Sequence, residues 1–298
     1  MTSDVRAAST EKLQKALADL GLGSRREIEG WISAGRVAVN GVVATLGARV
    51  SSGDRIDVDG VERRRASDGA AGLVGGPRVL LMNKAEGVIC TRRDPEGRPT
   101  CFDGLPRLPG GRWIAVGRLD INSSGLLLFA NDGALAHALM HPSTGLAREY
   151  AVRVDCELEP AVIAALTEGV LLADGELARF AELEHAGGSG RNHWYRVVLA
   201  EGRNREVRNL FESQGVRVSR LKRVRYGPIA LPSSIKRGRY EPLSFDDVAR
   251  LYALVGLEVP ADARRSRGRD SRRSERKPDA HADRSRQRNA RGRRRAAR

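Results

Sequence analysis

The chain has 298 residues, enough for one large domain or two, and 41% of them are apolar, which allows a substantial hydrophobic core. Its net charge of +15 at pH 7 favours an anionic partner, but the charge is unevenly distributed. Residues 262–298 hold sixteen basic and five acidic residues, which leaves a net charge of only +4 for the first 261. We expect a mildly basic folded part and a disordered Arg-rich tail, residues 259–298, that attracts polyphosphate without sequence preference.

The three cysteines, Cys90, Cys101 and Cys156, contain no Cys-x-x-Cys pair. An odd number cannot be fully bridged within one chain, so the pattern indicates reduced thiols and neither a disulfide framework nor a zinc site. The N-terminus has no apolar signal core, and no apolar run approaches ~18 residues. These features predict a soluble, cytoplasmic protein with no membrane association.

Residues 10–60 are predicted to form a first small module. Thr10 can cap a helix over residues 11–21, and a second helix, residues 24–35, begins at a serine. The Asn-Gly pair at 40–41 lies between two short β-prone runs and is the strongest hairpin signal in the chain. The order helix, helix, hairpin suffices for a small domain with a modest core.

Basic residues in this module could bind a phosphate backbone, since the start of a helix favours an anion. They are Lys12, Lys15, Arg25, Arg26 and Arg36. An ordinary solvated helix face explains the same charges, because acidic residues are interspersed among them. The segment KLQKALADLGLGSRREIEGWISAGRVAVNG, residues 12–41, resembles the RNA-binding module named after small-subunit ribosomal protein four. That resemblance implies binding to folded RNA.

Residues 61–77 are charged, then Gly- and Ala-rich, and are predicted to be a flexible linker. Residues 78–258 follow as a second, larger domain. Predicted strands over 78–84, 112–120, 126–130, 148–156, 193–202 and 218–231 alternate with predicted helices over 134–142, 160–170, 204–215 and 242–257. No strict βαβ repeat links them, so we expect an α+β domain with a mixed, largely antiparallel sheet.

A lone carboxylate stands in the segment VGRLDINSSGLLLFANDG, residues 116–133. Asp120 precedes an apolar run typical of a buried strand, and Asn-Asp-Gly closes that run as a turn. We therefore place Asp120 on a loop at the mouth of the sheet, where it could meet a ligand. Hydrogen bonding within its own turn is an alternative explanation for this aspartate.

Other site chemistries find weaker support in the sequence. No obvious second acid lies near Asp120 for a two-carboxylate hydrolase, and no Gly-x-Ser-x-Gly motif marks a serine nucleophile. His137 and His141 are four apart on a predicted helix, but no Glu or Cys accompanies them, so we interpret both as surface or packing residues. Arg208 falls beside apolar residues of its predicted helix and needs a carboxylate. Asp120 is the natural candidate, and a structural ion pair elsewhere is the alternative.

Several separated motifs together resemble one group of ribosomal RNA pseudouridine synthases. The group comprises synthase A, which acts on small-subunit RNA, and synthases B, E and F, which act on large-subunit RNA. The motifs are the Asp120 segment, REY at 148–150 and EGRNREVRNLF at 201–211. The resemblance implies that Asp120 is the catalytic aspartate, Tyr150 the active-site tyrosine and Arg208 the basic residue paired with Asp120.

The last of these motifs also contains Arg203 and Arg205, which are expected to contact RNA. Ala85, Met82 and Asn209 depart from the usual family pattern, but none of them carries the chemistry.

The reaction that the resemblance implies is isomerisation of uridine to pseudouridine, by nucleophilic aspartate chemistry on a flipped base. It involves no redox change and no external energy source, so we expect neither a cofactor nor a metal. The segments DPEGRPT and RNREVR favour large-subunit 23S ribosomal RNA as the partner. We expect the enzyme to be a monomer. A small-subunit 16S synthase of the same family, or a ribosome-assembly factor that binds RNA without turnover, remains an alternative.

Overall fold

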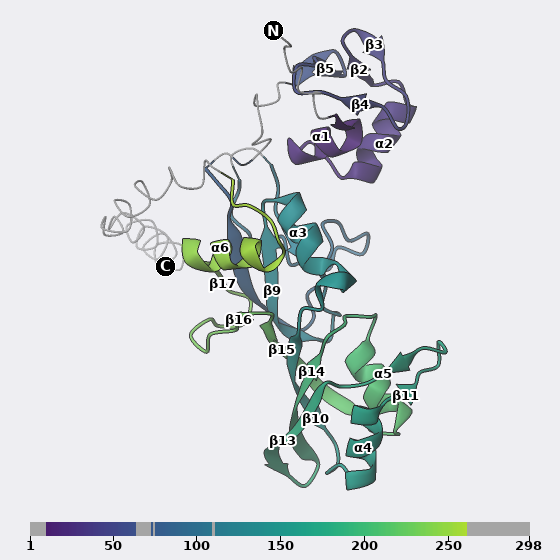
Figure 1. The fold of residues 1–298 in the computed structure, drawn as a ribbon, viewed down its shortest axis with the longest axis vertical. Coiled ribbons are helices and arrows are strands. Elements are labelled where there is room, and N and C mark those ends of the chain that lie inside the picture. The colour runs from purple at the N-terminus through teal and green to yellow at the C-terminus, as the bar shows by residue number, and fades with distance from the viewer. Residues whose placement is uncertain (1–9, 64–72, 74, 109–110, 261–298) are drawn as a thin grey trace, which may run out of the picture. The chain divides into compact units, whose positions relative to one another are not determined.

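The N-terminal part is a small helix–helix–sheet module. The computed structural model describes residues 10–63, 73, 75–108 and 111–260. Helices α1 (Leu13–Asp19) and α2 (Arg25–Ser33) precede a four-stranded sheet of order β3-β2-β5-β6 (Figure 1). Its strands are β2 (Val37–Val39), β3 (Val42–Val43), β5 (Ile56–Val58) and β6 (Val61–Arg63). Leu13, Leu17, Ile28 and Ile56 are fully buried between helices and sheet, which confirms the predicted helix–helix–hairpin order.

The starts of the two helices differ from each other. Ser24 caps α2, as the sequence predicts, and together with Glu27 it forms a reciprocal capping box. Thr10 does not cap α1, because the next two residues form β1 (Glu11–Lys12), which pairs with β4 (Arg49–Val50). Asn40 and Gly41 both have positive φ, 51° and 83°, as a tight hairpin turn of the predicted kind requires.

The larger domain is built on one nine-stranded mixed sheet. Its order is β13-β14-β10-β15-β9-β7-β17, with β16 added to β15 and β8 to β9. The strands are β7 (Val79–Lys84), β8 (Ile114–Val116), β9 (Ser124–Ala130), β10 (Arg148–Val154), β13 (Glu182–Ser189), β14 (Asn192–Leu199), β15 (Val218–Tyr226), β16 (Ile229–Ala230) and β17 (Tyr240–Pro242). Every pairing is antiparallel except that of β9 with β15. The predicted mixed, largely antiparallel sheet is confirmed.

Helices cover both faces of the central strands, so strand β9 is buried throughout. Leu127 and Phe129 point into the core that contains α5 (Glu206–Ser213). Leu126 and Leu128 point to the opposite core, under α3 (Gly133–Met140) and α6 (Phe245–Leu254) (Figure 1). Burial on both sides explains why this strand appears in the sequence as a continuous apolar run. Helix α4 (Pro160–Glu168) precedes the hairpin β11 (Val170–Leu171) and β12 (Leu177–Ala178).

Some predicted boundaries are wrong. Residues 61–63 are predicted to belong to the linker but form a strand that pairs with β5. Val259 is predicted to begin the tail but packs against the core under α3 and α6. The sequence does not predict strand β13, because it is exposed along most of its length and a bulge interrupts it between His185 and Gly188. The rest of the predicted linker, residues 64–72 and 74, and the predicted tail, residues 261–298, lie outside the described residues.

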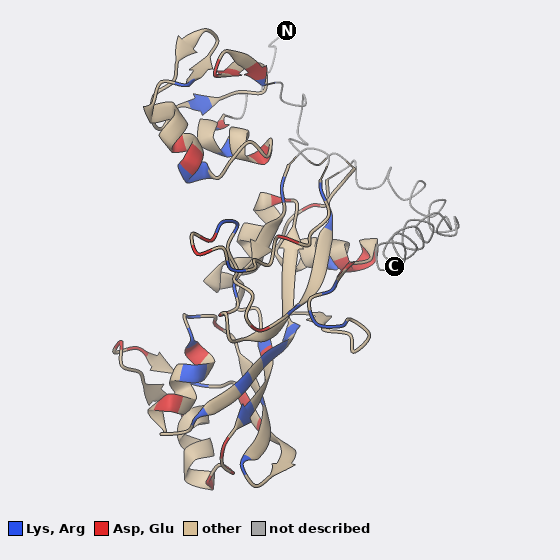
Figure 2. Cartoon of the chain, turned by 180° about the vertical axis from the view of Figure 1, so that it is seen from behind, with Lys and Arg blue, Asp and Glu red and all other residues tan. Residues whose placement is uncertain are grey.

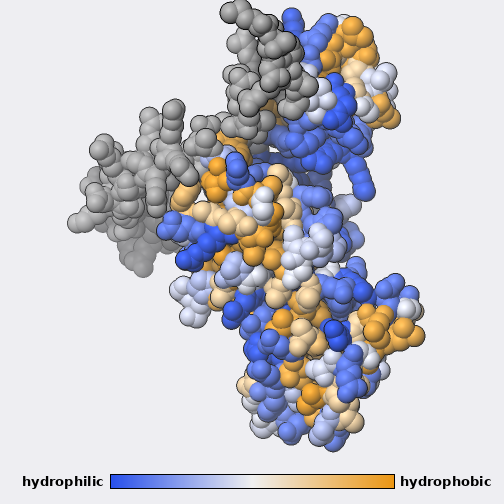
Figure 3. Space-filling view, in the orientation of Figure 1, coloured by the Kyte–Doolittle hydropathy of each residue, from blue (hydrophilic) through white to orange (hydrophobic). Residues whose placement is uncertain are grey.

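Exposed apolar and basic side chains gather in different places. Figure 3 shows a hydrophobic patch on the N-terminal module, where Val42, Val43 and Leu46 are 71%, 60% and 60% exposed. Figure 2 shows Lys and Arg recurring along the long strands of the larger domain. Four of these basic residues lie on strand β15: Arg220, Lys222, Arg223 and Arg225. Among the described residues no helix is long and apolar enough to cross a bilayer.

Candidate functional site

Asp120 lies on the loop between β8 and β9, as the sequence predicts. Its side chain is half-buried and borders a cleft of about 920 Å³, within the usual range for a small-ligand site. The backbone oxygen of Asp120 accepts a hydrogen bond from the Ser123 amide at 3.0 Å, so the loop begins as a tight turn. The carboxylate is thus presented by a short, ordered loop at the N-terminal end of the central strand β9.

Lys84 holds this loop from behind. It is the last residue of β7, is fully buried, and its ammonium donates to the backbone oxygens of Ala85, Asp120 and Ser123 at 3.0, 3.0 and 2.8 Å. Burial lowers the pKa of Lys84, and nearby groups that include Asp120 oppose this shift. Three carbonyl acceptors compensate the buried cation, and in return the cation fixes the position of the Asp120 loop.

Arg208 is close to this loop but does not form the predicted ion pair with Asp120. Its two terminal nitrogens donate to the backbone oxygens of Val218 and Asn122, each at 3.0 Å, and no contact within 4.0 Å joins its guanidinium to the Asp120 carboxylate. Burial, with a smaller contribution from Arg205, lowers the pKa of Arg208, while the charge of Asp120 raises it. Backbone carbonyls thus satisfy the two terminal nitrogens, whereas Nε is buried without a hydrogen-bond partner. Asp120 interacts with Arg208 only at longer range.

The order of the strands brings Tyr150 to the same cleft. Tyr150 of β10 is opposite Arg223 of β15, and Arg223 is opposite Gly125 at the start of β9. Gly125 has φ +102°, and a Cβ there would lie 2.2 Å from the Arg223 backbone oxygen, so only glycine allows this approach. Tyr150 is 8% exposed and lines the cleft together with Asp120.

Cationic side chains dominate the cleft. Seven arginines line it against two acids, Asp120 and Glu206. The arginines are Arg92, Arg98, Arg118, Arg148, Arg203, Arg205 and Arg223. A cleft with this excess of positive charge concentrates polyanions, and the arginine fork matches phosphate oxygens.

Two of these arginines are buried beside Tyr226. The guanidinium carbons of Arg148 and Arg223 lie 5.2 and 5.0 Å from the centre of its ring. Arg148 donates to the backbone oxygens of Leu146 and Ala200, at 3.0 and 3.1 Å, and Arg223 donates to that of Leu126 at 2.8 Å. One terminal nitrogen of Arg223 is buried without a hydrogen-bond partner. Arg223 therefore keeps one unused donor beside the cleft that it lines.

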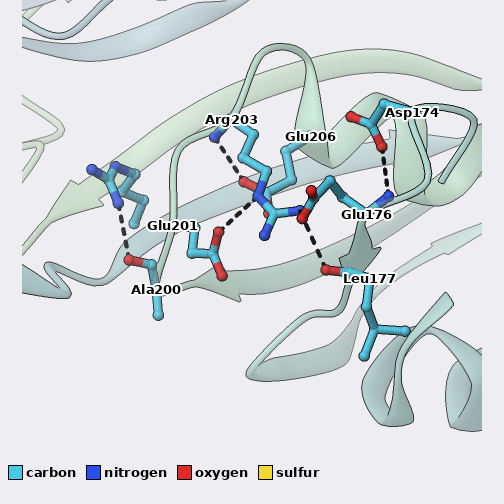
Figure 4. A network of polar contacts seen from close by, with 8 residues as sticks. Asp174, Glu176, Leu177, Ala200, Glu201, Arg203 and Glu206 are labelled. Carbon is cyan, nitrogen blue, oxygen red and sulfur yellow. Dashed lines mark hydrogen bonds and ion pairs between the residues drawn. The ribbon is translucent and has the colours of Figure 1, made fainter. Parts of the chain in front are cut away.

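The predicted RNA-contacting arginines beside α5 are engaged with carboxylates. Figure 4 shows Arg203 within a network where its side chain donates to Glu201 at 2.8 Å and its backbone amide donates to Glu206 at 3.0 Å. Arg205 has positive φ, 52°, and contacts Glu212 at 3.4 Å. Both side chains line the cleft, but each already has an anionic partner.

The predicted RNA-contacting residues of the N-terminal module divide into two groups. Lys15 pairs with Glu11 and Asp19, and Arg36 forms a bidentate pair with Asp59 at 2.8 and 2.6 Å. Lys12, Arg25 and Arg26 are exposed, and none of the three forms an ion pair with a described residue. The second group is the one free to meet a phosphate.

The two histidines of α3 have structural surroundings. His141 ends that helix, and its Nδ1 lies 2.7 Å from the Ser143 hydroxyl, while its ring centre is 5.7 Å from that of His137. Within the described ranges no group of three or more His, Cys, Asp or Glu side chains is arranged to hold a metal.

Sequence reasoning missed Lys84, Arg148 and Arg223. A lysine that ends an apolar run, as in RVLLMNK, is a signal of a buried cation that could have pointed to Lys84. Arg148 and Arg223 have no such local signal, because both lie on strands with regular alternation. Their importance comes only from the pairing of β10, β15 and β9.

Known proteins match both parts of the chain. The family model for RNA pseudouridylate synthase matches residues 78–213, and that for the S4 domain matches residues 11–56. Proteins named ribosomal large subunit pseudouridine synthase B are 56%, 54% and 51% identical in Pseudomonas aeruginosa, Haemophilus influenzae and Salmonella typhi. The alignments cover 84%, 86% and 89% of this chain. They span 64%, 71% and 90% of those relatives' own lengths.

A solved structure described as a pseudouridylate synthase is also similar to this chain. It aligns with a TM-score of 0.55 and 25% sequence identity, and covers 80% of this chain and 99% of its own. The sequence matches, the sheet and the carboxylate loop before β9 lead to one conclusion: the chain belongs to the RNA pseudouridylate synthase family and carries an S4 domain ahead of the synthase domain.

Proposed function

We propose that this protein is a pseudouridine synthase that isomerises a uridine of large-subunit ribosomal RNA. The observation that carries the proposal is Asp120, a carboxylate held by its backbone at the edge of an arginine-lined cleft that it shares with Tyr150. The names of the relatives support the large-subunit substrate. We also propose that the protein acts as a cytoplasmic monomer.

The reaction moves a glycosidic bond within one nucleotide. The bond from ribose C1′ to uracil N1 breaks, the base turns, and a bond from C1′ to C5 forms. The proton on C5 is lost and N1 gains one, so atoms and electrons balance without an oxidant or reductant. In this scheme the Asp120 carboxylate starts the reaction, either by adding to the nucleotide or by driving elimination at the sugar.

The surroundings of Asp120 suit this role. Because Lys84 and Arg208 bind backbone oxygens of the loop, they fix the carboxylate without occupying it. The carboxylate oxygens remain available to the substrate, and preorganisation of this kind lowers the cost of reaching the transition state. The ring of Tyr150 can stack on uracil, and its hydroxyl can exchange the C5 proton.

The rest of the molecule accounts for binding. C1′ and C5 are not accessible within a base stack, so the target nucleotide must rotate out into the cleft. Exposed Arg118, two residues before Asp120, is placed to contact its phosphates. We assign Lys12, Arg25 and Arg26 of the N-terminal module to the docking of a neighbouring RNA stem-loop.

Purified protein incubated with unmodified transcripts of 23S and 16S ribosomal RNA tests the proposal. Pseudouridine is mapped by carbodiimide labelling and primer extension. We expect one dominant site, in 23S RNA. Modification of 16S RNA alone would show that the substrate is small-subunit RNA. Tight binding without modification of either RNA would favour an assembly factor and overturn the proposed activity.

A further inference from the structure

Two cysteines that the proposed reaction does not use lie next to each other beside the Asp120 loop. Ile89 and Thr100 form a parallel bridge, in which the Ile89 amide donates to Pro99 and the Cys101 amide donates to Ile89, at 3.0 and 2.9 Å. Cys90 and Cys101 directly follow the two bridge residues, and a hydrogen bond joins their side chains. The backbone bridge brings the two segments to about 5 Å from each other, and thiols within hydrogen-bond reach are close enough to form a disulfide after a small movement.

The two thiols have different surroundings. Cys90 is half-buried and lines the cleft, whereas Cys101 is 2% exposed and packs in the core beneath it. A hydrogen bond from Cys101, the Leu119 amide, and the charges of Lys84 and Arg223 together lower the pKa of Cys90. The same contact and burial raise the pKa of Cys101. An accessible thiolate beside a protonated thiol is the arrangement of an attacking and a resolving cysteine.

Cys90 is also connected to the carboxylate. The Leu119 amide donates to the sulfur of Cys90 at 3.4 Å, and Leu119 directly precedes Asp120. In a disulfide the Cys90 sulfur loses its negative charge and moves to about 2 Å from the sulfur of Cys101. The Leu119 amide then loses this acceptor, and the loop loses one of the contacts that position Asp120.

We propose that Cys90 and Cys101 are a dithiol that hydroperoxides oxidise to a disulfide, which displaces the Asp120 loop and slows turnover. The Cys90 thiolate attacks the terminal oxygen of the peroxide and the O–O bond breaks, which yields a sulfenic acid and releases hydroxide from hydrogen peroxide, or an alkoxide from an organic hydroperoxide. The sulfur of Cys101 then displaces the sulfenic oxygen, and its proton leaves with that oxygen as water. Two thiols supply the two electrons that reduce the peroxide.

Hydrogen peroxide applied to the full-length reduced protein tests the inference. We expect a crosslinked peptide pair that joins residues 90 and 101 in mass spectrometry without reductant, and faster amide hydrogen exchange over residues 117–121. Cys156→Ser is the matched control, because Cys156 is exposed and distant in sequence, and it should leave both results unchanged. Cys101→Ser should abolish the crosslink and leave Cys90 trapped by dimedone as a sulfenic acid.

The effect on rate rests on the proposed function. Oxidation should slow single-turnover isomerisation by about ten- to a hundredfold, the usual cost of a small displacement of a reacting group, with recovery in dithiothreitol. Absence of the 90–101 crosslink overturns the inference, and so does a crosslinked protein with unchanged exchange over 117–121 or an unchanged rate. If the reduced protein modifies no RNA, the proposed function fails, while the crosslink and exchange results still decide the inference.

Discussion

Arginine and lysine serve two different purposes in the two folded parts of this chain. In the N-terminal module Lys12, Arg25 and Arg26 are exposed and have no ion pair with a described residue. In the synthase domain Lys84 and Arg208 are 0% and 6% exposed and donate to backbone carbonyls. The first group offers charge to a ligand, whereas the second uses charge and hydrogen bonds to hold the Asp120 loop.

The difference predicts different consequences of mutation. Removal of an exposed cation weakens long-range attraction, which salt screens and which spreads over many contacts. Removal of a buried cation leaves carbonyl oxygens without donors inside the protein, and each costs about 1–3 kcal/mol. Variants of the buried group should therefore affect folding and chemistry, and variants of the exposed group should affect binding.

Lys84→Met should have the largest effect. The substitution removes the donor shared by Ala85, Asp120 and Ser123, so we expect a loss of about 3–5 kcal/mol in the free energy of unfolding and isomerisation below detection. Urea unfolding and single-turnover assays measure the two effects. Lys236→Met, at an exposed lysine, is the control. Wild-type stability and rate in Lys84→Met would show that the loop does not depend on this cation.

Arg208→Gln should have a smaller effect on stability but a large one on rate. Loss of the hydrogen bonds to Asn122 and Val218 frees the loop beside Asp120, and we expect a decrease in single-turnover rate of about a hundredfold. RNA affinity should change by less than about threefold, because Arg208 does not line the cleft. Arg250→Gln, at an exposed pair with Asp247, is the matched control. A change confined to affinity would move Arg208 into the binding group.

Local sequence patterns predict the Asp120 loop, because an apolar strand and a strong turn follow it directly. They do not reveal that the carbonyls of Asn122 and Val218, 86 and 10 residues from Arg208, reach its guanidinium. In this structure Arg208 therefore makes no direct ion pair with Asp120, and its predicted role beside Asp120 stays a prediction. The predicted cap at Thr10 fails for a similar reason, since Glu11 and Lys12 pair with residues 49–50. Periodicity and capping rules use only neighbouring residues, so they do not predict backbone partners that are distant in the sequence.

Arg25→Glu with Arg26→Glu should weaken RNA binding and leave the chemical step intact. Both residues begin α2, where an anion is favoured, and we expect a tenfold or larger rise in Kd, roughly 1.4 kcal/mol or more. The slope of log Kd against log salt should decrease by the amount expected for the loss of about two phosphate contacts. Rate at saturating RNA should stay within about twofold of wild type. Loss of rate at saturation would contradict the separation of docking from chemistry.

Deletion of residues 262–298 should have the smallest effect. The segment carries sixteen basic and five acidic residues, so its removal should weaken affinity mainly at low salt. Filter binding at two salt concentrations and single-turnover assays at saturating RNA separate affinity from chemistry. A change in which uridine is modified would make this segment a determinant of specificity.

In the proposed function Asp120 performs the chemistry, while its surroundings only position it. Asp120→Asn preserves the size of the side chain and the backbone oxygen that accepts from Lys84. We predict normal folding, RNA affinity within about twofold of wild type, and a single-turnover rate reduced by at least about 10⁴-fold. Turnover near the wild-type rate in Asp120→Asn would remove Asp120 from the mechanism and contradict the account.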